Sequence, residues 1–323
     1  MNYIVLDLEW NQSPHGKEYE REELPFEVIE IGAVKLNENL EIIDSFGEII
    51  RPTVYREMHR ICKEITGISS RDLKKGRYFT QVFPEFLAWC GVDYMFCTWG
   101  SGDLVELQRN MQYYKIENYF PFPLYFYDVQ KLFSLSCEDG KSRRNLKYAV
   151  EFLQIAELEK YHRAKADAIY TAEVIRNIDF AKVKDKVSVD CFRVPQSKME
   201  EVHLVFDTYC KDISQPYDSK EALMRDRRMQ MVRCYKCKKN AKRKIRWFSD
   251  GARACYSVSY CNEHGWLKGK IRIRKTTDGR YYGIRTLKLI DRKEADLIKE
   301  KQEQLREKRK LRRHKGSKQE TGF

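Results

Sequence analysis

The chain has 323 residues and a mass of 38.6 kDa, enough for one large domain or two to three smaller ones. No apolar run approaches the length of a membrane span, and the first ten residues carry acids where a secretory signal carries lysines. We therefore expect neither secretion nor membrane insertion. The ten cysteines are expected to be reduced thiols or metal ligands in the cytoplasm.

The net charge of +13 is divided unevenly along the chain. Residues 1–180 hold 22 Lys and Arg against 29 Asp and Glu, whereas residues 181–323 hold 39 against 19. The first part is therefore acidic and the second strongly basic. Lysines and arginines that neutralise phosphates release the counterions of a polyanion, so the basic part is typical of a nucleic-acid-binding module. A soluble basic surface without a ligand is the alternative.

Runs of β-branched and apolar residues predict five strands in the acidic part. They cover residues 3–9, 28–36, 42–50, 94–99 and 124–129. The turn sequence at residues 37–39 predicts an antiparallel hairpin between the second and third strands. Near residue 167 a helix is expected in which Ala164, Ala168 and Ala172 form a stripe of small side chains. Such a stripe lets a helix lie close against a sheet.

Acidic residues occur at positions from which they could face one cleft. Asp7 and Glu9 are two residues apart on the first strand, so they point to the same side. Two adjacent carboxylates suit a divalent cation, although a solvated strand edge also explains them. Asp103 lies in the first turn of an expected helix, where an acid also complements the helix dipole. Asp167 lies on a later helix, and His162 precedes it, where a lone histidine also serves as a local cap.

In this order the motifs resemble the DEDDh family of 3′→5′ exonucleases, the superfamily of RNase T and of the proofreading subunit of bacterial replicative polymerases. Residues 6–9 are similar to the first motif, residues 98–103 to the second and residues 162–168 to the third. In the third motif the family also places its histidine five residues before the last aspartate. Residues 26–34 and 65–68 resemble the Eri-like branch, which trims RNA. The resemblance covers residues 1–180.

The resemblance implies an RNase H-like α/β fold: a mixed five-stranded sheet with flanking helices. It also implies phosphodiester hydrolysis with two Mg²⁺ or Mn²⁺ ions and with His162 as the general base for the attacking water. The carboxylates that would hold these ions are Asp7, Glu9, Asp103 and Asp167. Many members have Thr or Ala after the first glutamate, whereas this chain has Trp10. We expect Trp10 beside the terminal nucleotide, where an indole can stack on a base.

The basic part is expected to contain three segments. Residues 181–230 are predicted to be a helical connector, with a helix from Ser219 to Met231. Residues 231–290 are expected to form a small zinc-ribbon-like β domain that binds nucleic acid, and residues 291–323 a basic helical tail. The tail carries a thin apolar stripe, formed by Ala295, Ile298, Gln302 and Leu305. Its charge fits a solvated tail and an electrostatic arm on nucleic acid equally well.

A pattern C-x2-C-x23-C-x2-H predicts a metal site in the small domain. Its members are Cys234, Cys237, Cys261 and His264. Two close pairs of this kind are typical of one tetrahedral, structural Zn²⁺ site. Cys255 is an alternative fourth ligand in place of His264, and unligated thiols are the other alternative.

Two hairpins are expected around this site, with turns at residues 249–251 and 278–279. Alternation in the strand that precedes the second turn places Lys270, Arg272 and Arg274 on one face. Together with Trp247 nearby, these cations suit a substrate-binding surface that follows phosphates and stacks bases.

Together these features predict a metal-dependent 3′→5′ exonuclease. Its substrate would be single-stranded nucleic acid or a 3′ overhang, with RNA slightly favoured over DNA, and a ribonucleoprotein is a further partner that fits. A non-catalytic binding protein that uses the exonuclease fold as a scaffold is the alternative. An RNA-binding zinc module joined to an unrelated first domain is a third interpretation, which requires the match of four acids and a histidine to be coincidental.

Overall fold

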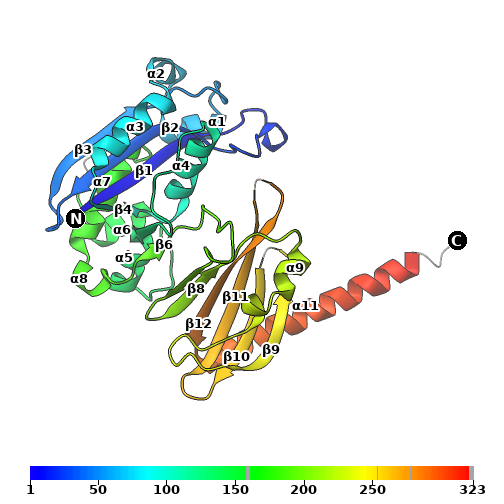
Figure 1. Ribbon diagram of the computed structural model, residues 1–323. Helices are drawn as coiled ribbons and strands as arrows, with labels where there is room; N and C mark the ends of the chain where they lie inside the picture. Colours follow the sequence, from blue (N-terminus) through cyan, green and yellow to red (C-terminus); the bar gives the residue numbers. More distant parts are fainter. Residues whose placement is uncertain (158–160, 253, 277, 320–323) are drawn as a thin grey trace. The chain divides into compact units, whose positions relative to one another are not determined.

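The computed structural model describes residues 1–157, 161–252, 254–276 and 278–319, with side chains as far as Arg309. It comprises two compact units, Met1–Arg193 and Val194–Phe323 (Figure 1). This division falls later in the chain than position 180, where the charge changes. None of the helices in the described part of the chain combines the length and the hydrophobicity that a bilayer crossing needs.

The first unit is built on a mixed six-stranded sheet (Figure 1). From edge to edge its strands are β3 (Ile42–Ile49), β2 (Glu27–Leu36), β1 (Asn2–Asn11), β4 (Tyr94–Thr98), β5 (Tyr125–Asp128) and β6 (Ser188–Val189). β1, β4 and β5 are parallel, whereas β2, β3 and β6 are antiparallel to their neighbours. The five expected strands are all present, but the expected number is wrong by one. β6 has two residues, too few for a periodic signal, and it lies where a helical connector was expected.

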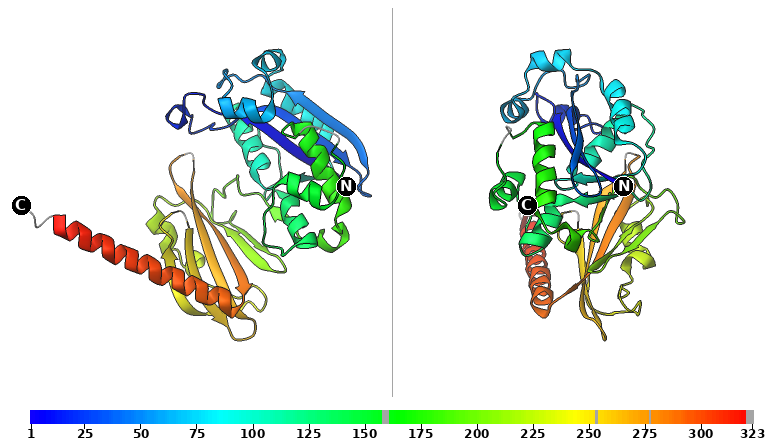
Figure 2. Two further views of the ribbon diagram at one scale, coloured as in Figure 1. Left: turned by 180° about the vertical axis from the view of Figure 1, so that it is seen from behind. Right: turned by 90° about the vertical axis from the view of Figure 1, so that its left-hand side faces the viewer.

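Helices cover both faces of this sheet (Figures 1 and 2). The described helices of this unit are η1 (Lys17–Tyr19), α1 (Arg60–Thr66), α2 (Ser70–Lys75), α3 (Phe79–Cys90), α4 (Gly102–Tyr113), α5 (Val129–Cys137), α6 (Leu146–Phe152), α7 (Ala164–Asn177) and α8 (Phe180–Val183). Leu6 and Leu8 of β1 pack with apolar residues of α3 and α4, whereas Val5 packs with those of α5, α6 and α7. Because side chains alternate along a strand, Asp7 and Glu9 lie on the face that α7 covers.

α7 begins directly against β2, at a glycine. A Cβ atom on Gly32 would lie 2.0 Å from the carbonyl carbon of Ala164, so only glycine allows so close an approach. The expected stripe of Ala164, Ala168 and Ala172 is completely buried. The helix that carries Asp167 is therefore held close to β2 and to the neighbouring β1, which carries Asp7 and Glu9.

The second unit contains an antiparallel six-stranded sheet. From edge to edge its strands are β7 (Val202–Val205), β8 (Tyr209–Ile213), β12 (Tyr281–Ile290), β11 (Gly265–Lys275), β10 (Ala254–Cys261) and β9 (Lys242–Ser249). Both expected hairpins, β9–β10 and β11–β12, are present. The sheet is nevertheless larger than the expected ribbon, because β7 and β8 come from the predicted helical connector and join it through β12.

Three helices accompany this sheet: α9 (Lys220–Arg225), α10 (Arg227–Gln230) and α11 (Arg292–Gln319). The single helix expected from Ser219 to Met231 is divided at Asp226. The carboxylate of Asp226 accepts hydrogen bonds from the backbone N–H groups of Arg228 and Met229 at 2.7 and 3.1 Å. It therefore caps a new helix instead of continuing the first one.

α11 is anchored to the sheet by its first turns. Ala295 and Ile298 are buried against Val258 of β10, as the apolar stripe predicts. Nζ of Lys268 lies 2.8 Å from a carboxylate oxygen of Glu294. Farther along the helix, Arg309 donates to the backbone carbonyl of Ser249 at 3.0 Å, and the helix continues past the strands of its unit (Figures 1 and 2). The expected basic tail is thus a helix that contacts the sheet from its first turns as far as Arg309.

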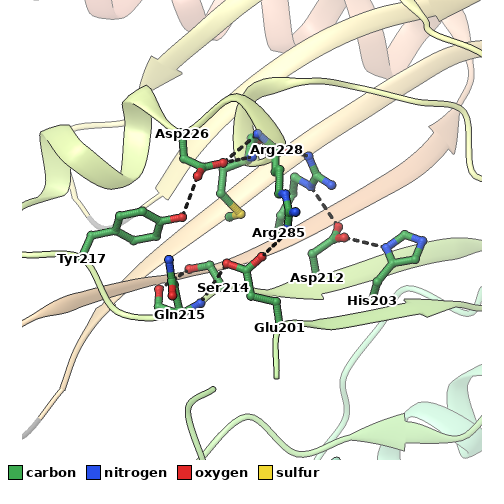
Figure 3. A network of polar contacts seen from close by, with 10 residues as sticks. Glu201, His203, Asp212, Ser214, Gln215, Tyr217, Asp226, Arg228 and Arg285 are labelled. Carbon is green, nitrogen blue, oxygen red and sulfur yellow. Dashed lines mark hydrogen bonds and ion pairs between the residues drawn. The ribbon is translucent and has the colours of Figure 1, made fainter. Parts of the chain in front are cut away.

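Arg285 of β12 organises the interior of the second unit (Figure 3). Its guanidinium pairs with Asp212 at 2.9 Å, and Asp212 in turn bonds to His203 at 2.6 Å. The same guanidinium donates to the backbone carbonyls of Met229 and Met231 at 3.2 and 2.8 Å. The segment that leads from α10 toward the first cysteine pair is therefore tied to the middle of the sheet.

Candidate active site and candidate metal centre

Four carboxylates meet beside the central strand of the first sheet. They belong to Asp7 and Glu9 on β1, to Asp103 in the first turn of α4 and to Asp167 in the first turn of α7. Oδ1 of Asp103 accepts a hydrogen bond from the backbone N–H of Leu8 at 3.2 Å. This bond ties the start of α4 to Leu8, the residue that lies between Asp7 and Glu9 in the sequence. The structure thus places together all four acids that the sequence motifs select.

Burial, followed by repulsion among neighbouring acids, raises the pKa values of this cluster. Burial raises the pKa of Asp7 well above its usual range, and the charges of Asp103, Asp167 and Glu9 add to the effect. Burial likewise raises the pKa of Glu9 to about 8, that of Asp103 to about 7 and that of Asp167 to about 6. Oδ1 of Asp167 is buried and has no hydrogen-bond partner among the described residues. Crowded carboxylate oxygens of this kind fit divalent cations, which neutralise their repulsion.

His162 lies two residues before α7, in a left-handed backbone conformation with φ of 64°. Its backbone N–H donates to Oδ2 of Asp167 at 3.2 Å, while its side chain is exposed. A ring nitrogen of His162 and carboxylate oxygens of Glu9 and Asp167 lie within 4.8 Å of one another. An exposed imidazole in this position can accept a proton from a water molecule beside the acids.

A fifth carboxylate, which the sequence motifs did not single out, adjoins the cluster. Glu30 on β2 lies opposite Glu9 in the β1–β2 register and is 4% exposed. It pairs with Arg163 at 2.7 Å and accepts a hydrogen bond from the backbone N–H of Ala164 at 3.0 Å. Only the strand register and the start of α7 bring Glu30 and Arg163 together, so sequence spacing gives no signal for the pair.

Trp10 follows a bulge that separates it from Glu9 in the strand register. Its ring packs on Phe26 with 5.7 Å between centroids. A Cβ atom on Gly102 would lie 3.9 Å from the Cη2 atom of the indole. The half-buried indole therefore lies beside the start of α4, next to the residue that precedes Asp103.

In the second unit the four expected zinc ligands lie together. The Sγ atoms of Cys234, Cys237 and Cys261 and a ring nitrogen of His264 are within 4.8 Å of one another. Sγ of Cys237 and Sγ of Cys261 are 3.5 Å apart, and Nδ1 of His264 is 3.6 Å from Sγ of Cys234. Ligands about 2.3 Å from a central Zn²⁺ would be about 3.8 Å apart in a tetrahedron. The cluster therefore fits a zinc ion in size and in ligand type.

The thiol of Cys261 has an environment that suits a metal ligand. Burial raises its pKa, but hydrogen bonds from His264 and from the backbone N–H groups of Glu263 and His264 outweigh this and lower the pKa to about 6. Metals bind the thiolate form of cysteine. Cys255, by contrast, is buried in an apolar cluster with Leu223 and Ile271. The geometry therefore favours His264 over Cys255 as the fourth ligand.

The expected basic face is present on β11. Arg272 and Arg274 are exposed, and alternation along the strand places them on one side with Lys270. Tyr256 of β10 lies opposite Lys270, whose Nζ is 5.5 Å from the centre of its ring. Nζ of Lys301 in α11 is 4.3 Å from the same ring. Cations and an aromatic ring thus alternate on this face.

Trp247 does not belong to that face. Its Nε1 donates to the backbone carbonyl of Gln230 at 2.9 Å, and its ring packs among buried residues on the other side of the sheet. A Cβ atom on Gly269 would lie 2.6 Å from the indole. The ring and the N–H of Trp247 are thus both engaged in contacts within the unit, which does not favour the expected stacking of Trp247 on bases.

A family model described as Exonuclease matches residues 4–175, which is more than half of the chain. The chain belongs to this exonuclease family. The matched segment lies within the first unit and contains the four clustered acids and His162. The expected exonuclease-family enzyme is therefore confirmed at the level of the family.

Two curated relatives carry names that state an activity. The probable 3'-5' exonuclease KapD of Bacillus subtilis is 26% identical over 127 residues, which are 37% of this chain and 56% of KapD. The 3'-5' exoribonuclease 1 of Rattus norvegicus is 34% identical over 86 residues, 24% of this chain and 25% of that protein. The chain thus spans less than two thirds of the length of these relatives.

Among solved structures, cell-death related nuclease 4 (CRN-4) has a TM-score of 0.50 at 19% sequence identity. The likeness covers 61% of this chain and 69% of that one. At this level of identity it shows the fold alone. It agrees with the expected α/β fold, in which a mixed sheet is flanked by helices.

Proposed function

We propose that this chain is a metal-dependent 3′→5′ exonuclease that shortens single-stranded nucleic acid or 3′ overhangs, with RNA favoured over DNA. The observation that carries the proposal is the cluster of four buried or half-buried carboxylates whose pKa values are raised, chiefly by burial, within the segment matched to the exonuclease family. The names of KapD and of exoribonuclease 1 support the direction of cleavage, and the latter supports RNA.

The four carboxylates fit two Mg²⁺ or Mn²⁺ ions, which prefer oxygen ligands. When bound, the ions would lower the pKa of the attacking water and stabilise the departing 3′ oxygen of the substrate. Asp7, Glu9, Asp103 and Asp167 must be deprotonated to hold them, so metal affinity should increase as the pH rises.

The remaining residues of the site orient these groups. The N–H of Leu8 occupies one oxygen of Asp103, and the N–H of His162 bonds to one oxygen of Asp167. His162 acts as the general base and takes the proton of the attacking water. Trp10, beside the start of α4, stacks on the terminal base.

The second unit binds the substrate and holds one structural Zn²⁺. Four ligands in two close pairs leave no open position for catalysis, so the ion would fasten residues 234–237 to the end of β10. Arg272 and Arg274 of β11, whose side chains are exposed, bind phosphates of the nucleic acid. Such contacts position a substrate without reading its sequence.

The test is incubation of the protein with single strands of RNA and of DNA, each labelled at the 3′ or the 5′ end, with Mg²⁺ or with a chelator. We expect immediate release of the 3′ label, progressive shortening of 5′-labelled strands, faster cleavage of RNA and no cleavage without metal. The Asp167→Asn variant serves as the matched inactive control. Binding of the strands without shortening in Mg²⁺ or Mn²⁺ would contradict the proposal.

A further inference from the structure

We propose that the Glu30–Arg163 ion pair is a positioning device for the active site, which pins the start of α7 and keeps the Glu30 carboxylate out of the metal-binding cluster. The inference rests on the proposed exonuclease function and adds two positioning residues to it. Neither residue is assigned to bind the substrate.

The position of Glu30 makes a negative charge on its side chain unfavourable unless that charge is paired. It lies directly opposite Glu9 in the β1–β2 register, where paired side chains are neighbours and like charges repel. Its side chain is 5% exposed, so water cannot solvate the charge. A buried carboxylate next to four others must be paired or it will compete for any cation nearby.

The partners of Glu30 all come from the start of α7. Arg163 donates from Nη2 at 2.7 Å and from Nε at 3.2 Å, and the backbone N–H of Ala164 donates at 3.0 Å. His162 precedes these two residues directly, and Asp167 follows in the first turn. Three hydrogen bonds to one carboxylate therefore set the position of the segment that supplies the general base and a metal ligand.

Arg163 and Glu30 differ in exposure. Because of this difference, the positioning role predicts unequal effects when one or the other partner is removed, whereas an ion pair that only stabilises the fold predicts equal effects. The side chain of Arg163 is 42% exposed, whereas that of Glu30 is 5% exposed. If Glu30 loses its charge, water can solvate Arg163. If Arg163 is removed, the buried Glu30 carboxylate loses its charged partner, and the nearest cations available to it would be those that the acid cluster binds.

Three variants exploit this asymmetry: Glu30→Gln, Arg163→Met and the double variant. Gln at position 30 can still accept the N–H of Ala164 but carries no charge. A misplaced catalytic group can cost about 100-fold in rate, and we expect a loss of that order in kcat for Arg163→Met, with KM changed by less than about threefold. Glu30→Gln should stay within about tenfold of the natural chain, and the double variant should recover to the level of Glu30→Gln.

Two further variants complete the set. Arg163→Lys keeps the positive charge and should retain most of the activity. Arg176→Met is the matched control, because Arg176 lies on the same helix, is 40% exposed and pairs with Glu173. It should behave like the natural chain.

Calorimetric titration with Mn²⁺ gives a readout that does not depend on turnover. Arg163→Met should bind Mn²⁺ at least as tightly as the natural chain despite its low activity, because one more carboxylate is available to the ion. The double variant should return to the natural affinity. Thermal unfolding should show the same asymmetry, with Arg163→Met less stable than Glu30→Gln.

Equal losses of kcat in the two single variants, with no recovery in the double variant, would overturn the inference. The ion pair would then only stabilise the fold. Weaker Mn²⁺ binding in Arg163→Met than in the double variant would also overturn it. A natural chain that cleaves no nucleic acid would instead overturn the proposed function. The titration and the unfolding data would still decide the question of the ion pair in that case.

Discussion

The two metal-competent clusters of this protein are organised in opposite ways. The carboxylates of the first unit come from positions 7, 9, 103 and 167, so a strand and two helices must pack before the cluster exists. The three cysteines and the histidine that form the cluster of the second unit lie within residues 234–264. The fold holds the carboxylates of the first cluster together although their charges repel one another. The ligands of the second cluster are close together in the sequence. We therefore expect metal to serve chemistry in the first and folding in the second.

Removal of one carboxylate should have the largest effect. Asp7→Asn or Asp167→Asn should reduce cleavage by at least about 1,000-fold, because each removes a ligand charge from the proposed metal pair. Without metal these variants should be as stable as the natural chain or more stable, since the substitution relieves repulsion. Initial rates and thermal unfolding with and without Mg²⁺ test both points. Near-native activity of both variants would falsify the assignment, and Glu151→Gln, an exposed acid on α6, is the control.

Loss of a thiolate should unfold one unit and spare the other. The natural chain should contain about one zinc, and binding of a structural zinc is worth on the order of 10 kcal/mol. Cys234→Ser should therefore lose the metal and the protease resistance of the second unit, while residues 1–193 stay folded. Elemental analysis and limited proteolysis measure these effects. Cys255→Ser is the control and should keep zinc; the reverse result, with zinc retained by His264→Ala, would move the fourth ligand to Cys255.

Removal of the second unit should affect binding more than chemistry. A chain that ends at Arg193 should show KM raised by about tenfold and a flatter dependence on salt, because phosphate contacts are lost, with a smaller change in kcat. Steady-state kinetics at several salt concentrations check this. Arg272→Gln combined with Arg274→Gln should act in the same direction with a smaller effect. Unchanged KM and salt dependence in the shortened chain would show that the basic unit serves another partner.

The smallest expected effect is a change of stability with pH that comes from the acid cluster and not from the zinc site. Without Mg²⁺, burial raises the pKa of Glu9 to about 8, that of Asp103 to about 7 and that of Asp167 to about 6, above those of unfolded carboxyl groups near 4. The folded state then binds more protons, so stability falls as the pH rises through this range. Calorimetry of Mg²⁺-free protein that retains zinc should show Tm decreasing from pH 6 to pH 8.5, and Mg²⁺ should remove the decrease. A Tm that rises over this range would contradict the raised pKa values of the cluster.

Much of the first unit could be predicted from the sequence because its signals are local. Strand periodicity gave β1 to β5, and the motifs gave the four acids and His162. The ion pair of Glu30 could not be predicted, since it depends on which residues of β1, β2 and α7 meet. Gly32 is similar: its need for space becomes visible only when α7 lies on β2.

The second unit was harder to predict because short strands carry little periodic signal and because periodicity within one strand does not show which residues of other strands lie beside it. β7 and β8 have four and five residues; they pair with each other, and β8 also pairs with β12, so neither segment is helical. Alternation placed Arg272 and Arg274 on one face, but it could not place Trp247 of another strand. The ligand spacing succeeded because Cys234 and Cys237, like Cys261 and His264, are held close by the chain itself.

The two-residue strand β6 affects how the chain folds during its synthesis. It pairs with β5, and Asp190 beside it donates its N–H to Leu124 at 2.8 Å and accepts from Gln108 at 2.9 Å. Until this segment has left the ribosome, β5 presents unpaired N–H and C=O groups, which are a template for association with another chain. A fragment that stops where the family match ends, at residue 175, would keep that open edge permanently and should aggregate.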